Sequence, residues 1–239
     1  MILTENKYKL LNDNCLDVLH KIKDESIDCI VTDPPYKMTS RGNTGNTGGM
    51  LKKKIVNSGQ VFKYNNIDCT EYAPEFYRVL KDGTHCYIMT KHINLQHMLN
   101  TFTDCGFKFV KSLIWNKGNK IMGHYYMSCY EYILMFRKGK GRRINNCGTP
   151  DILSVKNQKH KDENGKNLHD TEKPVELMKI LIDNSTNEND VILDPFVGIG
   201  STGLAALELN RKFIGVEIDE TYYHIAKERQ KIYENTLSL

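Results

Sequence analysis

Short apolar runs rich in β-branched residues alternate with segments of helical periodicity along most of this 239-residue chain. Such runs predict buried strands, and apolar positions three and four residues apart predict helices that pack on them. The predicted strands are residues 8–12, 27–31, 84–89, 107–115, 130–136, 190–194 and 212–217. The predicted helices are residues 16–22, 71–80, 93–102, 171–182, 204–209 and 220–233. This alternation predicts one α/β domain, 1–239, with a mostly parallel sheet and helices on both faces.

The strand at 27–31 leads into the turn Asp33-Pro34-Pro35-Tyr36. Proline has no backbone N–H, and Pro35 restricts the residue before it to an extended conformation. The strand therefore ends here and leaves Asp33 at its carboxyl end. In open α/β sheets, ligands bind at this edge.

The side chains and carbonyls of this turn match an exocyclic amine on a nucleobase. The two N–H bonds of the amine can point to the Asp33 carboxylate and the Pro34 carbonyl, while Tyr36 stacks on the ring. An aromatic amine is a poor nucleophile because its lone pair is delocalised, and two acceptors would localise that pair for attack on an electrophile. The alternative interpretation is an ordinary Pro-Pro surface turn.

A second candidate site follows the strand that ends at Asp194. Gly198 and Gly200 allow a tight turn and a close approach of the backbone to a ligand. The next strand ends at Glu217, where a carboxylate can accept hydrogen bonds from both hydroxyls of a ribose. Strand, glycine turn, helix, strand and acid together predict a nucleotide-binding βαβ unit.

With Gly203, the loop also satisfies the dinucleotide pattern G-x-G-x-x-G. Too few residues follow Gly203 for the rest of a dinucleotide-binding domain, and hydride transfer has no evident use for Asp-Pro-Pro-Tyr. The two candidate sites make sense together if the sheet is circularly permuted, with the cofactor half at the carboxyl end of the chain and the catalytic half in front.

The net charge is only +4, but two segments are strongly basic. Residues 37–64 are also rich in glycine, which predicts a mobile loop beside the candidate site. Residues 138–168 show no strong periodicity, which predicts an irregular insertion. Two basic segments on a mildly acidic body indicate a polyanionic partner. Lysine-rich solvated loops are the simpler alternative.

The seven cysteines are scattered and form no Cys-x-x-Cys pair. They are typical of small core residues in a reducing cytoplasm and predict neither disulfides nor a metal site. No stretch approaches the roughly 18 apolar residues of a membrane span.

Three separated elements resemble those of the β-class S-adenosylmethionine-dependent DNA amino-methyltransferases. The family's acceptor element is matched by residues 33–36, its Phe-x-Gly-x-Gly element by residues 196–200, and its His-Pro-Thr-Gln-Lys-Pro element by residues 169–174. Asp170 and Glu172 depart from the last pattern. The resemblance covers nearly the whole chain and implies a circularly permuted, Rossmann-like methyltransferase fold with S-adenosylmethionine as cofactor.

The resemblance also implies roles for individual residues. The catalytic residues would be Asp33, Pro34, Pro35 and Tyr36. The residues around the cofactor would be Asp13, Cys15, His169, Thr171, Lys173, Asp194, Phe196, Gly198, Gly200 and Glu217. The two basic segments supply the predicted DNA contacts: Lys37, Arg41, Lys52, Lys53, Lys54, Lys138, Lys140, Arg142 and Arg143. Segment 138–168 occupies the place of the family's target-recognition region.

Transfer from a sulfonium needs no metal, and the target base would be flipped out of DNA into the site. The family methylates N6 of adenine or N4 of cytosine, and Asp at the head of the acceptor turn favours adenine. More remote alternatives are an RNA or protein-amide methyltransferase and a non-catalytic DNA-binding module. A homodimer and a cognate restriction endonuclease stay open as partners.

Overall fold

The computed structural model describes residues 7–35, 66–121, 126–160, 165 and 172–237. Its centre is an eight-stranded sheet in the order β1-β8-β7-β2-β3-β5-β4-β6. In that order the strands are Tyr8–Asn12, Lys212–Glu217, Val191–Asp194, Ile27–Thr32, Leu80–Thr90, Ser128–Arg137, Lys108–Ile121 and Ile152–Ser154. Neighbours are parallel except at β5, which runs antiparallel to both β3 and β4.

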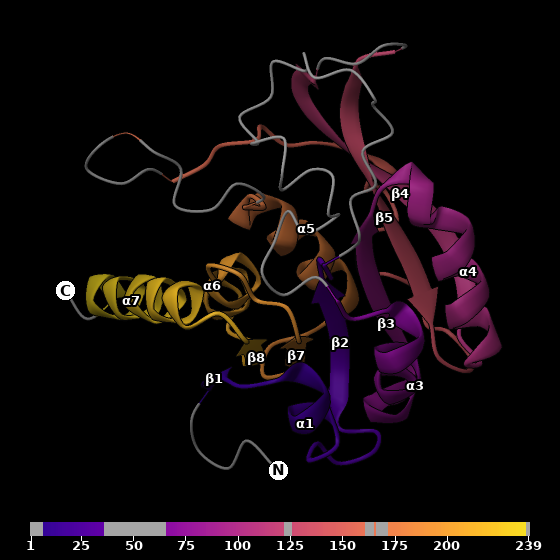
Figure 1. Ribbon diagram of the computed structural model, residues 1–239, viewed down its shortest axis with the longest axis horizontal. Helices are drawn as coiled ribbons and strands as arrows, with labels where there is room; N and C mark the ends of the chain where they lie inside the picture. Colours follow the sequence, from indigo (N-terminus) through magenta and orange to yellow (C-terminus); the bar gives the residue numbers. More distant parts are fainter. Residues whose placement is uncertain (1–6, 36–65, 122–125, 161–164, 166–171, 238–239) are drawn as a thin grey trace.

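Helices cover both faces of this sheet (Figure 1). One face carries α1 (Cys15–Leu19), α3 (Cys69–Val79) and α4 (Leu95–Asp104), the last preceded by the short 3₁₀ turn η1 (His92–Asn94). The other face carries α5 (Val175–Ser185), α6 (Ser201–Glu208) and α7 (Glu220–Leu237). The predicted α/β class and mostly parallel sheet are confirmed.

The two faces of β2 show why a strand buried on both sides is a continuous apolar run. Ile30 packs with Leu19 and Phe76 on the face of α1 and α3. Val31 points the other way and packs with Leu181 and Phe213. Successive side chains of a strand alternate between faces, so both neighbours had to be apolar.

The sequence-distant halves of the chain meet at the middle of the sheet. Strand β7 lies beside β2, with Cys29 opposite Ile192 and Ile30 opposite Leu193. From this junction, the sheet extends through β8 and β1 on one side and through β3 on the other. Ligands bind at such a switch point, outside the carboxyl ends of the strands. The predicted permutation therefore puts residues 33–35 and 194–200 at neighbouring positions along one sheet edge.

Some element boundaries differ from the predicted ones. Strand β3 begins at Leu80 and includes Gly83, whose φ of +76° belongs to a bulge where the register with β2 shifts. Strand β4 continues to Ile121 and forms a long hairpin with β5. Segment 138–168 is not wholly irregular, because β6 within it extends the sheet.

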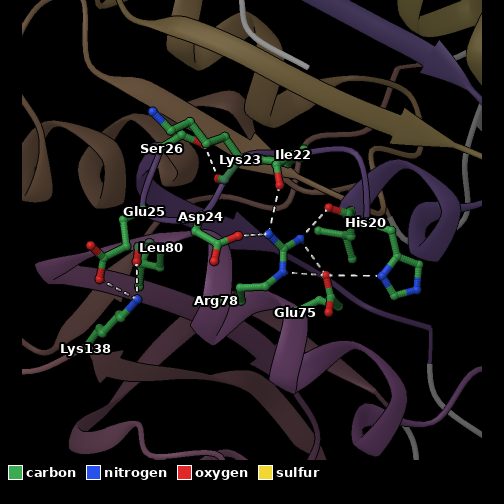
Figure 2. Close-up of polar contacts among 11 residues, drawn as sticks. His20, Ile22, Lys23, Asp24, Glu25, Ser26, Glu75, Arg78, Leu80 and Lys138 are labelled. Carbon is green, nitrogen blue, oxygen red and sulfur yellow. Dashed lines mark hydrogen bonds and ion pairs between the residues drawn. The ribbon is translucent and has the colours of Figure 1, made fainter.

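The amino edge of the sheet is fixed by side chains from distant elements (Figure 2). Arg78 of α3 donates to the carbonyls of Leu19 at 2.8 Å and Ile22 at 2.9 Å. It also pairs with Asp24 and Glu75. These bonds hold the turn between α1 and β2 and so set where β2 begins.

Within the described residues, no helix is long and apolar enough to cross a membrane.

Candidate active site

A cavity of about 480 Å³ opens at the carboxyl edge, over the junction of β2 and β7. Nearly all described residues predicted for catalysis or cofactor binding line it: Asp13, Cys15, Asp33, Pro34, Pro35, Lys173, Asp194, Phe196, Gly198 and Glu217. Tyr36, His169 and Thr171 lie outside the described residues. The two predicted sites are therefore parts of one cavity.

Gly200 is the exception, because it does not line the cavity. It is the N-cap of α6 and has a φ of +91°, in the left-handed region that favours glycine. A Cβ atom there would lie 3.1 Å from the Cβ of Ala226 in α7. The requirement for glycine at this position is conformational and steric.

Asp33 lies at the rim of the cavity, directly after β2, with its side chain 22% exposed. Lys173, just before α5, donates from its amino group to Asp33 Oδ2. Burial raises the pKa of Asp33, and the Lys173 ammonium opposes that rise. The turn thus places a carboxylate at the cavity, and the Lys173 ammonium compensates its negative charge.

Glu131 of β5 is the second carboxylate that contacts this lysine. Its Oε2 lies 3.5 Å from the Lys173 amino group, and its Oε1 accepts a bond from Lys117 of β4. Burial disfavours the charged form of Glu131, but Lys173 and Lys117 outweigh it, so its pKa is lowered. Glu131 and Lys117 were not among the predicted site residues, although a charged residue within the apolar run 130–136 was an available signal.

Glu217 holds the glycine loop against the end of β8. Its Oε2 accepts a bond from the backbone N–H of Gly198 at 2.7 Å, and its Oε1 accepts one from Asp219 at 2.8 Å. Burial raises the pKa of Glu217 to about 7, while these two N–H groups oppose the rise. Each carboxylate oxygen keeps a second lone pair, which is the capacity needed for two ribose hydroxyls.

Asp194 joins the two halves of the site. Its Oδ1 accepts a 2.6 Å bond from the hydroxyl of Thr32, the last residue of β2, and a 3.1 Å bond from the N–H of Phe196. Burial raises the pKa of Asp194 to about 6. Thr32 was not among the predicted site residues, because a β-branched residue in a strand run gives no separate signal. It ties the acceptor turn directly to the glycine loop.

The turn after β1 closes another side of the cavity. Asn12 donates from its side-chain amide to the carbonyl of Glu217 at 2.8 Å, which fixes the ends of β1 and β8 together. Asp13 and Cys15 follow and line the cavity. Burial raises the pKa of the Cys15 thiol to about 12, so Cys15 presents a neutral, apolar surface.

Lys138, one of the predicted DNA contacts, is paired within the fold. Its side chain is only 10% exposed, donates to the carbonyl of Leu80 at 2.8 Å and pairs with Glu25 at 3.1 Å (Figure 2). Because β5 is antiparallel, its end brings Lys138 to the amino edge of the sheet. This lysine is part of the fold.

Lys140, Arg142 and Arg143 follow at the same amino edge. The N–H of Arg142 donates to the carbonyl of Gly83, and its guanidinium donates to that of Ser185 at 2.7 Å. Strand β2 has six residues, so the two edges are about 20 Å apart at about 3.3 Å per residue. The structure therefore does not bring these three residues to the cavity. Lys37, Arg41, Lys52, Lys53 and Lys54 lie outside the described residues.

One described group offers three potential metal ligands: Asp68, Cys69 and His97. Asp68 is the N-cap of α3 and accepts bonds from the backbone N–H of Thr70 at 3.0 Å and from its hydroxyl at 2.9 Å. His97 binds the same carboxylate at 3.0 Å. Helix capping accounts for this cluster.

The model of a DNA methylase family, the N6/N4 methyltransferases, matches residues 27–228. The chain belongs to this family. The DNA methylase is 32% identical over 254 residues to the type II methyltransferase M2.DpnII of Streptococcus pneumoniae. This match covers 97% of this chain and 92% of the relative. It is 30% identical over 242 residues to M.HinfI of Haemophilus influenzae, with 92% of this chain and 67% of the relative covered.

Solved structures agree on the fold of the DNA methylase. The complex of M1.HpyAVI with S-adenosylmethionine superposes with a TM-score of 0.67 at 24% identity and covers 93% of this chain and 99% of that one. The cytosine-N4-specific PvuII DNA methyltransferase has a TM-score of 0.72 at 18% identity and covers 99% and 96% of the two chains. The predicted Rossmann-like methyltransferase fold is confirmed, and the enzyme is dependent on S-adenosylmethionine.

The residues of the cavity fit this cofactor. A volume of about 480 Å³ lies in the range of small-molecule sites. Glu217 supplies a buried carboxylate, a group that accepts hydrogen bonds from hydroxyls. Phe196 supplies an apolar wall and is itself held edge-on against Tyr72, with ring centroids 5.3 Å apart. Lys173 supplies a cation at the same cavity.

Proposed function

We propose that this DNA methylase transfers a methyl group to the exocyclic N6 of adenine, with the target base flipped into the cavity beside Asp33. The observation that carries the proposal is that the acceptor turn and the glycine loop line one cavity, joined by the bond between Thr32 and Asp194. Asp at the head of the turn favours adenine, whereas Ser-Pro-Pro-Tyr is more usual in cytosine-N4 relatives. The likeness to the PvuII enzyme, at 18% identity, bears on the fold alone.

Catalysis is positioning of the amine by this chain's own groups. Asp33 accepts one N–H bond of the amine, and the carbonyl of Pro34 accepts the other. These two bonds draw the nitrogen lone pair out of conjugation with the ring. Asp33 also stabilises the positive charge that develops on nitrogen and accepts the proton that the amine then loses. When bound, the cofactor supplies a methyl group that a sulfonium makes electrophilic.

The cofactor is held by the elements that converge on the cavity. Glu217 accepts bonds from the ribose hydroxyls, and Phe196 and Cys15 provide apolar contacts. Gly198 has a φ of +58°, which favours glycine, and the absence of a side chain lets the loop backbone approach the cofactor closely. Target DNA reaches the site only as an extruded base, because the amine is inaccessible in this geometry inside a duplex.

The test is to identify the modified nucleoside in DNA from a host that expresses the protein. Enzymatic digestion and mass spectrometry should find N6-methyladenine, and it should be absent from a matched host that expresses Asp33→Ala. N4-methylcytosine alone would refute the choice of adenine. Methylation of RNA or of a protein amide, with unmodified DNA, would refute the proposed target altogether.

A further inference from the structure

Four charged side chains of alternating sign form a row that starts at the acceptor turn. Asp33 accepts from Lys173, Lys173 lies 3.5 Å from Glu131, and Glu131 accepts from Lys117. The side chains of Lys173, Glu131 and Lys117 are only 7%, 11% and 10% exposed. The four residues of the row come from four different places in the fold: the end of β2, the segment before α5, β5 and β4.

Such a row of buried charges beside a cavity is costly for the fold. Charged groups removed from water need close partners, and an apolar cluster of the same volume is often as stable or more so. The row therefore calls for a reason other than folding. The pattern of contacts supplies one, because Lys173 binds Asp33 directly, Glu131 is linked to Asp33 through Lys173, and Lys117 is linked to it through Glu131 and Lys173.

We propose that Lys173 and Glu131 are positioning residues that keep Asp33 ionised and correctly turned for the target amine. Lys173 binds Oδ2 of Asp33, which leaves Oδ1 to accept the amine N–H. Glu131 holds the Lys173 amino group from the other side, and Lys117 neutralises Glu131. The proposal rests on the proposed role of Asp33 as the amine acceptor.

The electrostatics of Asp33 give this proposal a signature. The charged groups that act on Asp33 are Lys173, Glu131 and Lys91, and Asp194 lies across the junction from it. Burial raises the pKa of Asp33, Lys173 and Lys91 lower it, and Glu131 raises it. Loss of the lysine charge must therefore move this pKa up, and loss of the Glu131 charge must move it down.

Activity requires ionised Asp33, so the rate falls as pH drops through the pKa of Asp33. In Lys173→Met this acid limb should move to higher pH, whereas in Glu131→Gln it should move to lower pH. A displacement of about one pH unit changes the rate about tenfold at a fixed pH on the limb. A merely structural role would lower the rate or the stability without moving the limb in opposite directions.

The experiment measures single-turnover methyl transfer to DNA between about pH 5 and pH 9 for the full-length enzyme and its variants. Lys173→Arg keeps the charge and should retain a limb close to that of the wild type. Lys111→Met is a matched control. Lys111 lies on β4 and forms an exposed ion pair with Asp151, so its loss should leave the pH–rate profile unchanged. Thermal melting at each pH shows that every variant compared is folded.

The opposite displacement of the two limbs would support the proposal. Unmoved limbs, or two limbs displaced in the same direction, would overturn it. If Lys173→Met does not fold, Glu131→Gln and Lys173→Arg still decide, because only the first should displace the limb. The result does not depend on which base is methylated, so a cytosine product would refute the proposed target and leave this test intact. Activity in Asp33→Ala would instead refute the role on which the inference rests.

Discussion

Thr32→Val removes the hydroxyl that joins β2 to β7 and leaves the shape of the side chain almost unchanged. In the wild type, this hydroxyl lies 2.6 Å from Oδ1 of Asp194, and both residues are buried. A hydrogen bond to a charged, buried acceptor contributes about 1.5–3 kcal/mol. We therefore expect the free energy of unfolding to fall by about this amount at pH 8, where Asp194 is ionised.

The pH dependence of this loss is the more specific prediction. Burial raises the pKa of Asp194 from 3.8 to about 6, so the folded protein binds a proton that the unfolded chain has already released. The stability contributed by this group is full at low pH and declines as pH rises through the folded pKa. Without the Thr32 donor, that pKa rises further and the decline extends to higher pH. The cost of the substitution should therefore be small at pH 5 and full at pH 8.

The assay is urea unfolding of the wild type and Thr32→Val at about pH 5 and about pH 8, with Tm as a second readout. For a chain of this length, the loss at the higher pH corresponds to roughly 3–12 °C in Tm. Thr84→Val is the matched control: Thr84 is buried, but its hydroxyl donates to the neutral carbonyl of Lys81 at 2.7 Å. Its cost should be the same at both pH values. An equal cost of Thr32→Val at both would refute the reasoning.

Three further predictions concern the site and its surroundings. Asp33→Ala should lower the rate of methyl transfer by at least about 10²-fold in single-turnover assays, while calorimetry finds S-adenosylmethionine binding largely intact; near-normal turnover would contradict the role of Asp33. Glu217→Gln should weaken S-adenosylmethionine about tenfold or more by loss of a charge-assisted acceptor, again by calorimetry, and unchanged affinity would show that Glu217 does not hold the ribose. The double variant Lys140→Ala and Arg143→Ala should keep wild-type affinity for DNA in a fluorescence-anisotropy titration, because both residues lie at the amino edge; a clear loss would place DNA there.

The parts of the site that local chemistry dictates could be predicted from the sequence. Pro34 and Pro35 end a strand wherever they occur, so Asp33 had to lie at a carboxyl end. Gly198 with its positive φ and Glu217 at the end of the next strand follow the same logic. Each of these positions is fixed by a few adjacent residues.

The partners of those residues could not be predicted, because tertiary structure supplies them. Thr32 meets Asp194 across 162 positions of sequence, and Lys173 meets Asp33 across 140. Glu131 contacts Lys173 from β5, and nothing in the sequence indicated that β5 lies beside β3. Such contacts depend on the strand order, and periodicity does not give the order.

The location of residues 138–143 could not be predicted for a related reason. A count of charges finds a basic segment but does not say at which edge of the sheet it begins. Strand β5 runs against its neighbours, so its last residue is at the amino edge, and the chain needs β6 to return toward the cavity. A single antiparallel strand thus brings these four basic residues to the edge opposite the cavity.

The place of β7 in the sheet has a consequence for the newly made chain. Residues 191–194 separate β2 from β8, yet they leave the ribosome after almost every other strand. Until then β2 exposes one edge, and β1 lacks its neighbour β8, so the nascent protein presents unpaired backbone groups. Chaperone binding during translation should accordingly concentrate on this stage. The same delay means that a nascent chain shorter than about 194 residues has the acceptor turn but lacks the glycine loop of the cavity.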